Sequence, residues 1–77
     1  MKRSEFLQAL EGQLEIPDGS LKEHQALSEI DAWDSLAAVL FIALADEKVG
    51  VVVSGDQIAK ARTVNDLLSL LGDKLTA

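Results

Sequence analysis

The chain has 77 residues, of which 48% are hydrophobic, and its 13 acidic and 7 basic residues give a net charge of −6. This length excludes a second domain, the hydrophobic share excludes intrinsic disorder, and the negative charge disfavours nucleic acid, whose phosphates it repels. Cysteine is absent, so disulfides and thiolate metal sites are excluded. We therefore expect residues 1–77 to form one small acidic domain.

The first segment has apolar residues at helical spacing behind Ser4, a candidate N-cap, and predicts a helix over residues 4–15 that Pro17 ends. It contains neither the apolar core nor the cleavage site of a signal peptide. The longest apolar run, residues 36–45, is far shorter than the roughly 20 residues of a membrane span. We therefore expect a cytoplasmic protein with no membrane span.

Residues 16–33 have no sustained hydrophobic period and predict a long loop, with Leu21, Leu27 and Ile30 as scattered apolar anchors. A loop of this length in a small domain is usually functional. A short helical turn between Leu21 and Leu27 is compatible with the pattern. The loop ends at Trp33, the only tryptophan, which we expect to pack against the bundle because its side chain carries so much apolar area.

Asp34 or Ser35 is placed to cap a second helix that ends near Val49. Gly50 follows at the position of a left-handed C-cap. This helix is apolar on nearly every face, which indicates either deep burial or a partner on its outer side.

The rest of the chain predicts two further helices. The valines at 51–53 have no strand to pair with and are expected to form an extended connector with one or two side chains turned inward. S-G-D-Q at 54–57 fits a capping box and opens a short helix to about Ala61, and T-V-N-D at 63–66 opens a last helix that ends between residues 72 and 75. The predicted fold is all-α: a small four-helix bundle of three longer helices and one short helix, with a long loop between helices one and two.

Ser35, within D-S-L at 34–36, lacks the residues that a hydrolase would require. A serine nucleophile needs a base within hydrogen-bonding reach, yet the only histidine, His24, lies in a polar segment upstream and no G-x-S-x-G turn is present. One histidine, no cysteine and acids without calcium-loop spacing also make no metal site. The sequence therefore predicts no catalytic residue, no metal ligand and no enzymatic activity.

W-D-S-L at 33–36 resembles the attachment motif of acyl carrier proteins, the phosphopantetheine-binding carrier family. The apolar helix with its glycine and aliphatic ending, residues 36–53, and T-V-N-D-L-L at 63–68 are similar to the family's later elements. D-S-L alone favours an ordinary helix cap. Its position, between a long loop and an apolar helix in a small acidic chain, favours the carrier interpretation and a resemblance over essentially the whole chain.

The resemblance implies that Ser35 carries 4′-phosphopantetheine, derived from coenzyme A, through a phosphodiester. A phosphopantetheinyl transferase would attach this arm at the serine, with Asp34 and Leu36 beside it. Acyl groups would be held as thioesters on the arm and presented to acyl-transferring or acyl-modifying enzymes of fatty-acid, lipid or polyketide-type biosynthesis. A helix N-terminus is also a favourable place for the anionic phosphodiester.

The resemblance further implies an acyl pocket between the second and third helices and a recognition face on the second helix. Fatty-acid carriers have acids soon after the motif leucine, whereas this chain has apolar residues there, which predicts a specialised rather than a housekeeping carrier. We expect Val39 and Ile42 to turn inward more easily than Leu40 and Phe41. The candidate pocket residues are Val39, Ala43, Ile58, Val64 and Leu68, and the candidate recognition residues are Ala37, Leu40, Phe41, Asp46 and Glu47.

Two alternatives to a loaded carrier stay open at this point. One is an unmodified, carrier-like interaction module that docks through its apolar second helix. The other is a small hydrolase using Ser35 and His24, for which we expect no activity. For the carrier we expect a monomer, whereas the interaction module predicts a stable protein complex.

Overall fold

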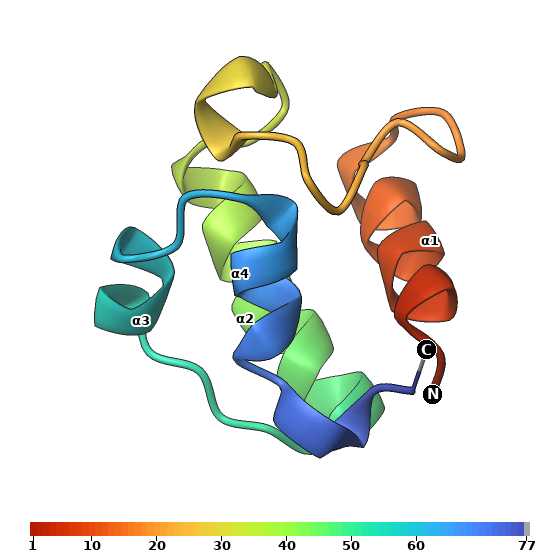
Figure 1. Cartoon of the computed structure of the whole chain (residues 1–77), viewed down its shortest axis with the longest axis vertical. Helices are drawn as coiled ribbons and strands as arrows, with labels where there is room; N and C mark the ends of the chain where they lie inside the picture. Colours follow the sequence, from red (N-terminus) through yellow and green to blue (C-terminus); the bar gives the residue numbers. More distant parts are fainter. Residues whose placement is uncertain (77) are drawn as a thin grey trace.

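The computed structural model describes residues 1–76, which contain four α-helices, two short 3-10 turns and no β-strand. The all-α class is therefore confirmed, whereas the prediction of three longer helices is not, because only two helices exceed six residues. Figure 1 shows the helices gathered around one interior, and Lys2 lies beside Thr76. The elements in chain order are α1 (Arg3–Leu14), η1 (Leu27–Glu29), α2 (Ser35–Val49), α3 (Gly55–Ala59), α4 (Val64–Ser69) and η2 (Gly72–Lys74).

Helix α1 begins at Arg3, one residue earlier than the sequence pattern indicates. Lys2 is the N-cap, and its amide N–H donates to the Glu5 side chain at 2.8 Å, so the prediction of Ser4 as the cap was wrong. The start is held further by the Arg3 amide, which donates to the Thr76 carbonyl at 2.8 Å. This contact joins the two ends of the chain and is invisible to a local pattern.

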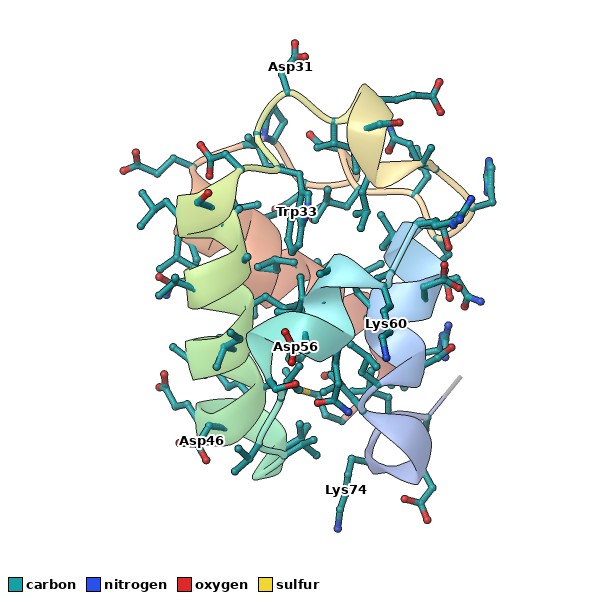
Figure 2. The ribbon with its side chains drawn as sticks, turned by 90° about the vertical axis from the view of Figure 1, so that its left-hand side faces the viewer. Asp31, Trp33, Asp46, Asp56, Lys60 and Lys74 are labelled. Atoms are coloured by element: carbon teal, nitrogen blue, oxygen red, sulfur yellow. The ribbon has the colours of Figure 1, made fainter. Side chains whose placement is uncertain are left out.

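The interior centres on three aromatic rings from three parts of the chain. Phe41 of α2 is fully buried and meets Phe6 of α1 edge-on, with ring centroids 5.6 Å apart. Trp33, at the end of the long loop, meets Phe41 edge-on, with ring centroids 6.3 Å apart. In Figure 2 the Trp33 side chain points from the loop toward the bundle interior. Such edge-to-face pairs are favourable beyond the area that they bury, and the expected structural packing of Trp33 is confirmed.

The long loop is fastened to the connection between α3 and α4. The Leu27 amide donates to the Arg62 carbonyl at 2.8 Å, and the Val64 amide donates to the Gln25 carbonyl at 3.1 Å. The predicted anchors Leu21 and Leu27 are both buried. The loop therefore has a fixed course, and its short helical turn, η1, begins at Leu27, the last residue of the window in which the sequence allowed one.

A buried carboxylate holds the first part of this loop. Glu11 of α1 is only 1% exposed, and one of its oxygens accepts the Leu21 amide N–H at 2.9 Å. Its other oxygen has no hydrogen-bond partner within residues 1–76. Because removing an acceptor from a buried N–H is costly, Glu11 is a structural residue that the amphipathic pattern of α1 conceals.

The two helices of the C-terminal half begin at their predicted caps but end earlier than expected. Ser54 and Gln57 form the predicted capping box of α3. In the connector before it, Val53 is buried and Val52 is 84% exposed, as expected for a segment with some valines turned inward. After Ser69 the amides of residues 70 and 71 bond three residues back instead of four, so the chain tightens into a 3-10 course and α4 stops early.

Candidate functional site

Ser35 is the first residue of α2 and is exposed. The preceding Asp34 is the N-cap, and its carboxylate accepts the Ala37 amide N–H at 2.9 Å. The first backbone bond of the helix runs from the Ala38 amide to the Asp34 carbonyl at 3.0 Å. The amides of Ser35 and Leu36 therefore donate no hydrogen bond within residues 1–76. The hydroxyl stands beside two free donors at the positive end of a fifteen-residue helix.

The surroundings of this serine are open and acidic. Glu29, Asp31 and Asp34 are all exposed, and Leu36 is 66% exposed. Figure 2 shows Asp31 pointing away from the bundle at the same end of the molecule. An enzyme of ordinary size can therefore reach the Ser35 hydroxyl, and positive charge on that enzyme would be attracted to the site.

The structure does not bring a catalytic base to Ser35. His24 is exposed in the long loop, and no hydrogen bond joins it to Ser35 in the part of the chain described. No group of three or more potential metal-ligating side chains is found within residues 1–76. Over the same residues, no helix has both the length and the apolarity that crossing a bilayer requires.

The outer face of α2 differs from the predicted recognition face. Ala37 and Phe41 are fully buried, so the expectation that they meet partners was wrong. Successive helical residues diverge by about 100°, and the contacts of Phe41 with the other aromatic rings fix which side of α2 faces inward. Leu40 is half-buried, and Asp46 and Glu47 are exposed, as their predicted roles require.

The predicted acyl-pocket residues separate into two groups. Ile58, Val64 and Leu68 are buried in the core. Val39 is 59% exposed and Ala43 is exposed, so these two do not line the interior. Val39 lies two residues, or about 200°, from Phe41, which places it on the opposite side of α2. The prediction that it turns inward was therefore wrong.

Comparison with known proteins agrees with the geometry at Ser35. A family model described as the phosphopantetheine attachment site matches residues 4–71. The chain belongs to this family of phosphopantetheine-binding carriers. Members carry covalently attached 4′-phosphopantetheine, are not catalysts, and interact with phosphopantetheinyl transferases and acyl-handling enzymes. Searches of curated proteins and of solved structures found no match.

The carrier has one further surface feature that sequence reasoning missed. A pocket of about 420 Å³ lies where η1 meets the connection between α3 and α4. No sequence pattern indicates this pocket, because it forms between two segments that are more than thirty residues apart in the chain. The two segments are joined by the hydrogen bond from the Leu27 amide to the Arg62 carbonyl. Its lining residues are Ala26, Leu27, Ser28, Ala61 and Arg62.

Proposed function

We propose that the carrier bears its 4′-phosphopantetheine arm on the Ser35 hydroxyl. The observation that carries this proposal is an exposed serine at the first position of α2, beside two amides with no partner in residues 1–76. Those amides and the helix dipole would stabilise the phosphodiester anion. The nearby acids are exposed and are free to meet a basic transferase surface.

The attachment step draws on the transferase for its chemistry. The Ser35 oxygen forms a bond to the phosphorus that carries pantetheine in coenzyme A. The bond from that phosphorus to the bridging oxygen breaks, adenosine 3′,5′-bisphosphate leaves, and the serine proton passes to a base on the transferase. Asp34 would hold the first turn of α2 in place through its bond to Ala37, and Leu36 would offer an exposed apolar contact.

The arm supplies the thiol that the chain itself lacks. We propose that acyl intermediates are held on it as thioesters and presented to acyl-transferring or acyl-modifying enzymes of fatty-acid, lipid or polyketide-type biosynthesis. Residues 1–77 would act as one carrier domain. The cytoplasmic location and the monomeric state remain predictions from the sequence.

Partner enzymes would meet the outer face of α2. Next to Ser35 this face presents an apolar stripe, which we define as Leu36, Val39, Leu40 and Ala43. Farther along come the exposed acids Asp46 and Glu47, and Figure 2 shows Asp46 directed outward near the far end of α2. This arrangement supports a specialised partner with an apolar seat beside basic residues.

The test is intact-mass measurement after incubation with a broad-specificity phosphopantetheinyl transferase and coenzyme A. We expect a gain of roughly 340 Da, the mass of the arm. Ser35→Ala should abolish the gain, while Ser28→Ala, which removes another exposed hydroxyl from the same end of the molecule, should keep it. If several transferases leave the wild-type mass unchanged, or if the Ser35 variant is still modified, the proposal fails.

A second candidate is an unmodified interaction module that docks through the apolar stripe. The exposure of Leu36 and Val39, at 66% and 59%, is the observation that favours it. Protein isolated from its native host separates the two candidates. Unmodified Ser35 in a stable complex would support the module, and a mass increased by the arm would support the carrier.

A further inference from the structure

The connector between α2 and α3, which we define as residues 50–53, has backbone groups that the fold leaves unpaired. The Val51 amide donates to the Ala45 carbonyl of α2 at 3.3 Å. The next two amides, of Val52 and Val53, donate no hydrogen bond within residues 1–76. Over the same residues the four carbonyls of the connector accept none. The connector therefore keeps both donors and acceptors for a backbone from outside the chain.

The side chains of the connector alternate as those of a β-strand do. Val51 is half-buried, Val52 is 84% exposed and Val53 is buried. In an extended segment, successive side chains point to opposite faces and successive N–H and C=O groups point to opposite edges. Because the bond to Ala45 directs the Val51 amide toward α2, the N–H and C=O of Val52 lie on the outer edge. Figure 1 shows the connector running without a helical turn from the end of α2 to α3.

Three consecutive valines on such an edge favour pairing with another extended chain. Branching at the β-carbon suits a strand, and an edge with unpaired N–H and C=O groups is a template on which a further strand can form. An extended peptide backbone carries donors and acceptors at the matching spacing. In the described part of the chain no strand pairs with the connector. The chemistry of this edge therefore selects an extended peptide segment as its ligand.

Charge and size narrow down the source of that segment. Asp46 and Glu47 are exposed in the last turns of α2, and Asp56 is exposed in the first turn of α3, against one exposed base, Lys48. This acidic border attracts basic residues and disfavours a second copy of the same acidic chain. Pairing with so short a connector buries far less than the roughly 1,000 Å² of a stable interface. The segment must therefore belong to a partner that also contacts other parts of the carrier.

We propose that the connector is a β-pairing edge for a partner enzyme, and that an extended segment of the partner with apolar or β-branched side chains and basic ends pairs with the backbone of Val52. The inference rests on the proposed carrier function and adds a second anchor to the apolar stripe. The stripe begins beside Ser35, whereas the connector follows Val49, fourteen residue steps or about 21 Å along α2. Contacts at both ends of α2 would fix the direction in which the partner lies relative to the arm.

The experiment uses the peptide acetyl-K-T-V-T-V-T-K-amide, titrated into the ¹⁵N-labelled full-length carrier and followed by NMR. We expect the largest shifts at the amides of Val52 and Val53, with nuclear Overhauser effects between the Val52 and peptide backbones. The same peptide with its three central amides N-methylated should bind about fivefold more weakly, the size of one lost hydrogen bond. A version with glutamate in place of both lysines should bind about threefold more weakly because of the acidic border.

Two variants of the carrier test the edge from the other side. Val52→Pro removes the backbone donor and should weaken peptide binding about fivefold. Val52→Thr keeps the donor and the branched shape and should retain most of the binding. Proline is tolerated on edge strands, and circular dichroism shows whether each variant is folded. The comparison of methylated and unmethylated peptides uses the wild type, so it does not depend on the folding of a variant.

Several results would overturn the inference. They are the absence of shifts at millimolar peptide, equal binding of the methylated peptide, and shifts centred on Leu36 and Val39 instead of Val52. Shifts at Val52 that depend on carrier concentration without any peptide would identify a second copy as the occupant and would also contradict the proposal. The titration uses the unmodified carrier, so failure of the attachment at Ser35, seen as absence of a mass gain, is a separate result.

Discussion

In both α2 and α4 the N-cap side chain accepts the amide N–H three residues on, but the first two amides of the two helices differ in their hydrogen bonds. At α4 the Val64 and Asn65 amides donate to carbonyls of the long loop, at 3.1 and 2.7 Å, and the Asp66 amide donates to the Thr63 hydroxyl at 3.2 Å. At α2 the corresponding first two amides, of Ser35 and Leu36, have no partner in residues 1–76. One helix start is closed by the fold, and the other can accept an anion.

The difference comes from what lies next to each helix start. The α4 start lies beneath the long loop, which supplies two carbonyls to it. The α2 start is the end of that same loop, and its first two residues are exposed, with no other segment of residues 1–76 bonded to their amides. A completed helix start contributes stability, whereas an incomplete one on the surface leaves donors for a ligand. This contrast, more than the three letters D-S-L, supports Ser35 as the attachment site.

The largest expected effect concerns the packing that holds the open start of α2. Phe41→Ala removes the ring that joins Phe6 and Trp33 and should destabilise the carrier by about 3–5 kcal/mol. Val39→Ala, on the outer face of the same helix, should cost less than about 0.5 kcal/mol. Urea unfolding followed by circular dichroism measures both. Similar losses for the two variants would mean that Val39 is packed inward after all.

The second prediction compares the two caps directly. Asp34→Ala and Thr63→Ala each remove a side-chain acceptor from a helix start, and each should cost about 1 kcal/mol of stability. Only Asp34→Ala should slow loading by the transferase, by about tenfold, because the first turn that positions Ser35 is then less fixed. Transferase kinetics with coenzyme A provide the readout. If Thr63→Ala slowed loading as much, the contrast between the two helix starts would have no functional meaning.

Local patterns were sufficient to predict several features of the fold and of the site. The caps at Asp34, Ser54 and Thr63 depend on contacts within three or four residues, so the sequence alone indicates them. The left-handed C-cap at Gly50, with φ 68°, is equally local. Ser35 was singled out by the resemblance of W-D-S-L to the carrier attachment motif, and its exposure agrees with that predicted role.

Features that depend on distant contacts were missed. An α2 that is apolar all round has no hydrophobic period from which to choose an inner face, and only the contacts of Phe41 with Phe6 and Trp33 decide its rotation. The pocket likewise exists only because the Leu27 amide pairs with the Arg62 carbonyl. These choices are made by tertiary packing, which neither propensity nor spacing contains.

The smallest expected effect is a change in the pH dependence of stability at the closed helix start. Backbone hydrogen bonds from Arg62 and Thr63 lower the pKa of Asp66 below its ordinary value of 3.8. A carboxyl group with a lowered folded-state pKa stabilises the fold above its unfolded pKa, and this contribution is lost as the pH falls through the folded value. Asp66→Asn keeps a hydrogen-bond acceptor but removes the charge, so the wild type should be more stable than the variant at pH 7 and this advantage should shrink below about pH 4.

Urea midpoints at pH 7 and pH 3 measure this difference. Asp73→Asn is the matched control, because the Asp73 side chain is exposed in η2 and accepts no hydrogen bond within residues 1–76. Its difference from the wild type should change less with pH than that of Asp66→Asn. Equal pH dependence in both variants would mean that the Asp66 carboxylate is not held by the α4 start.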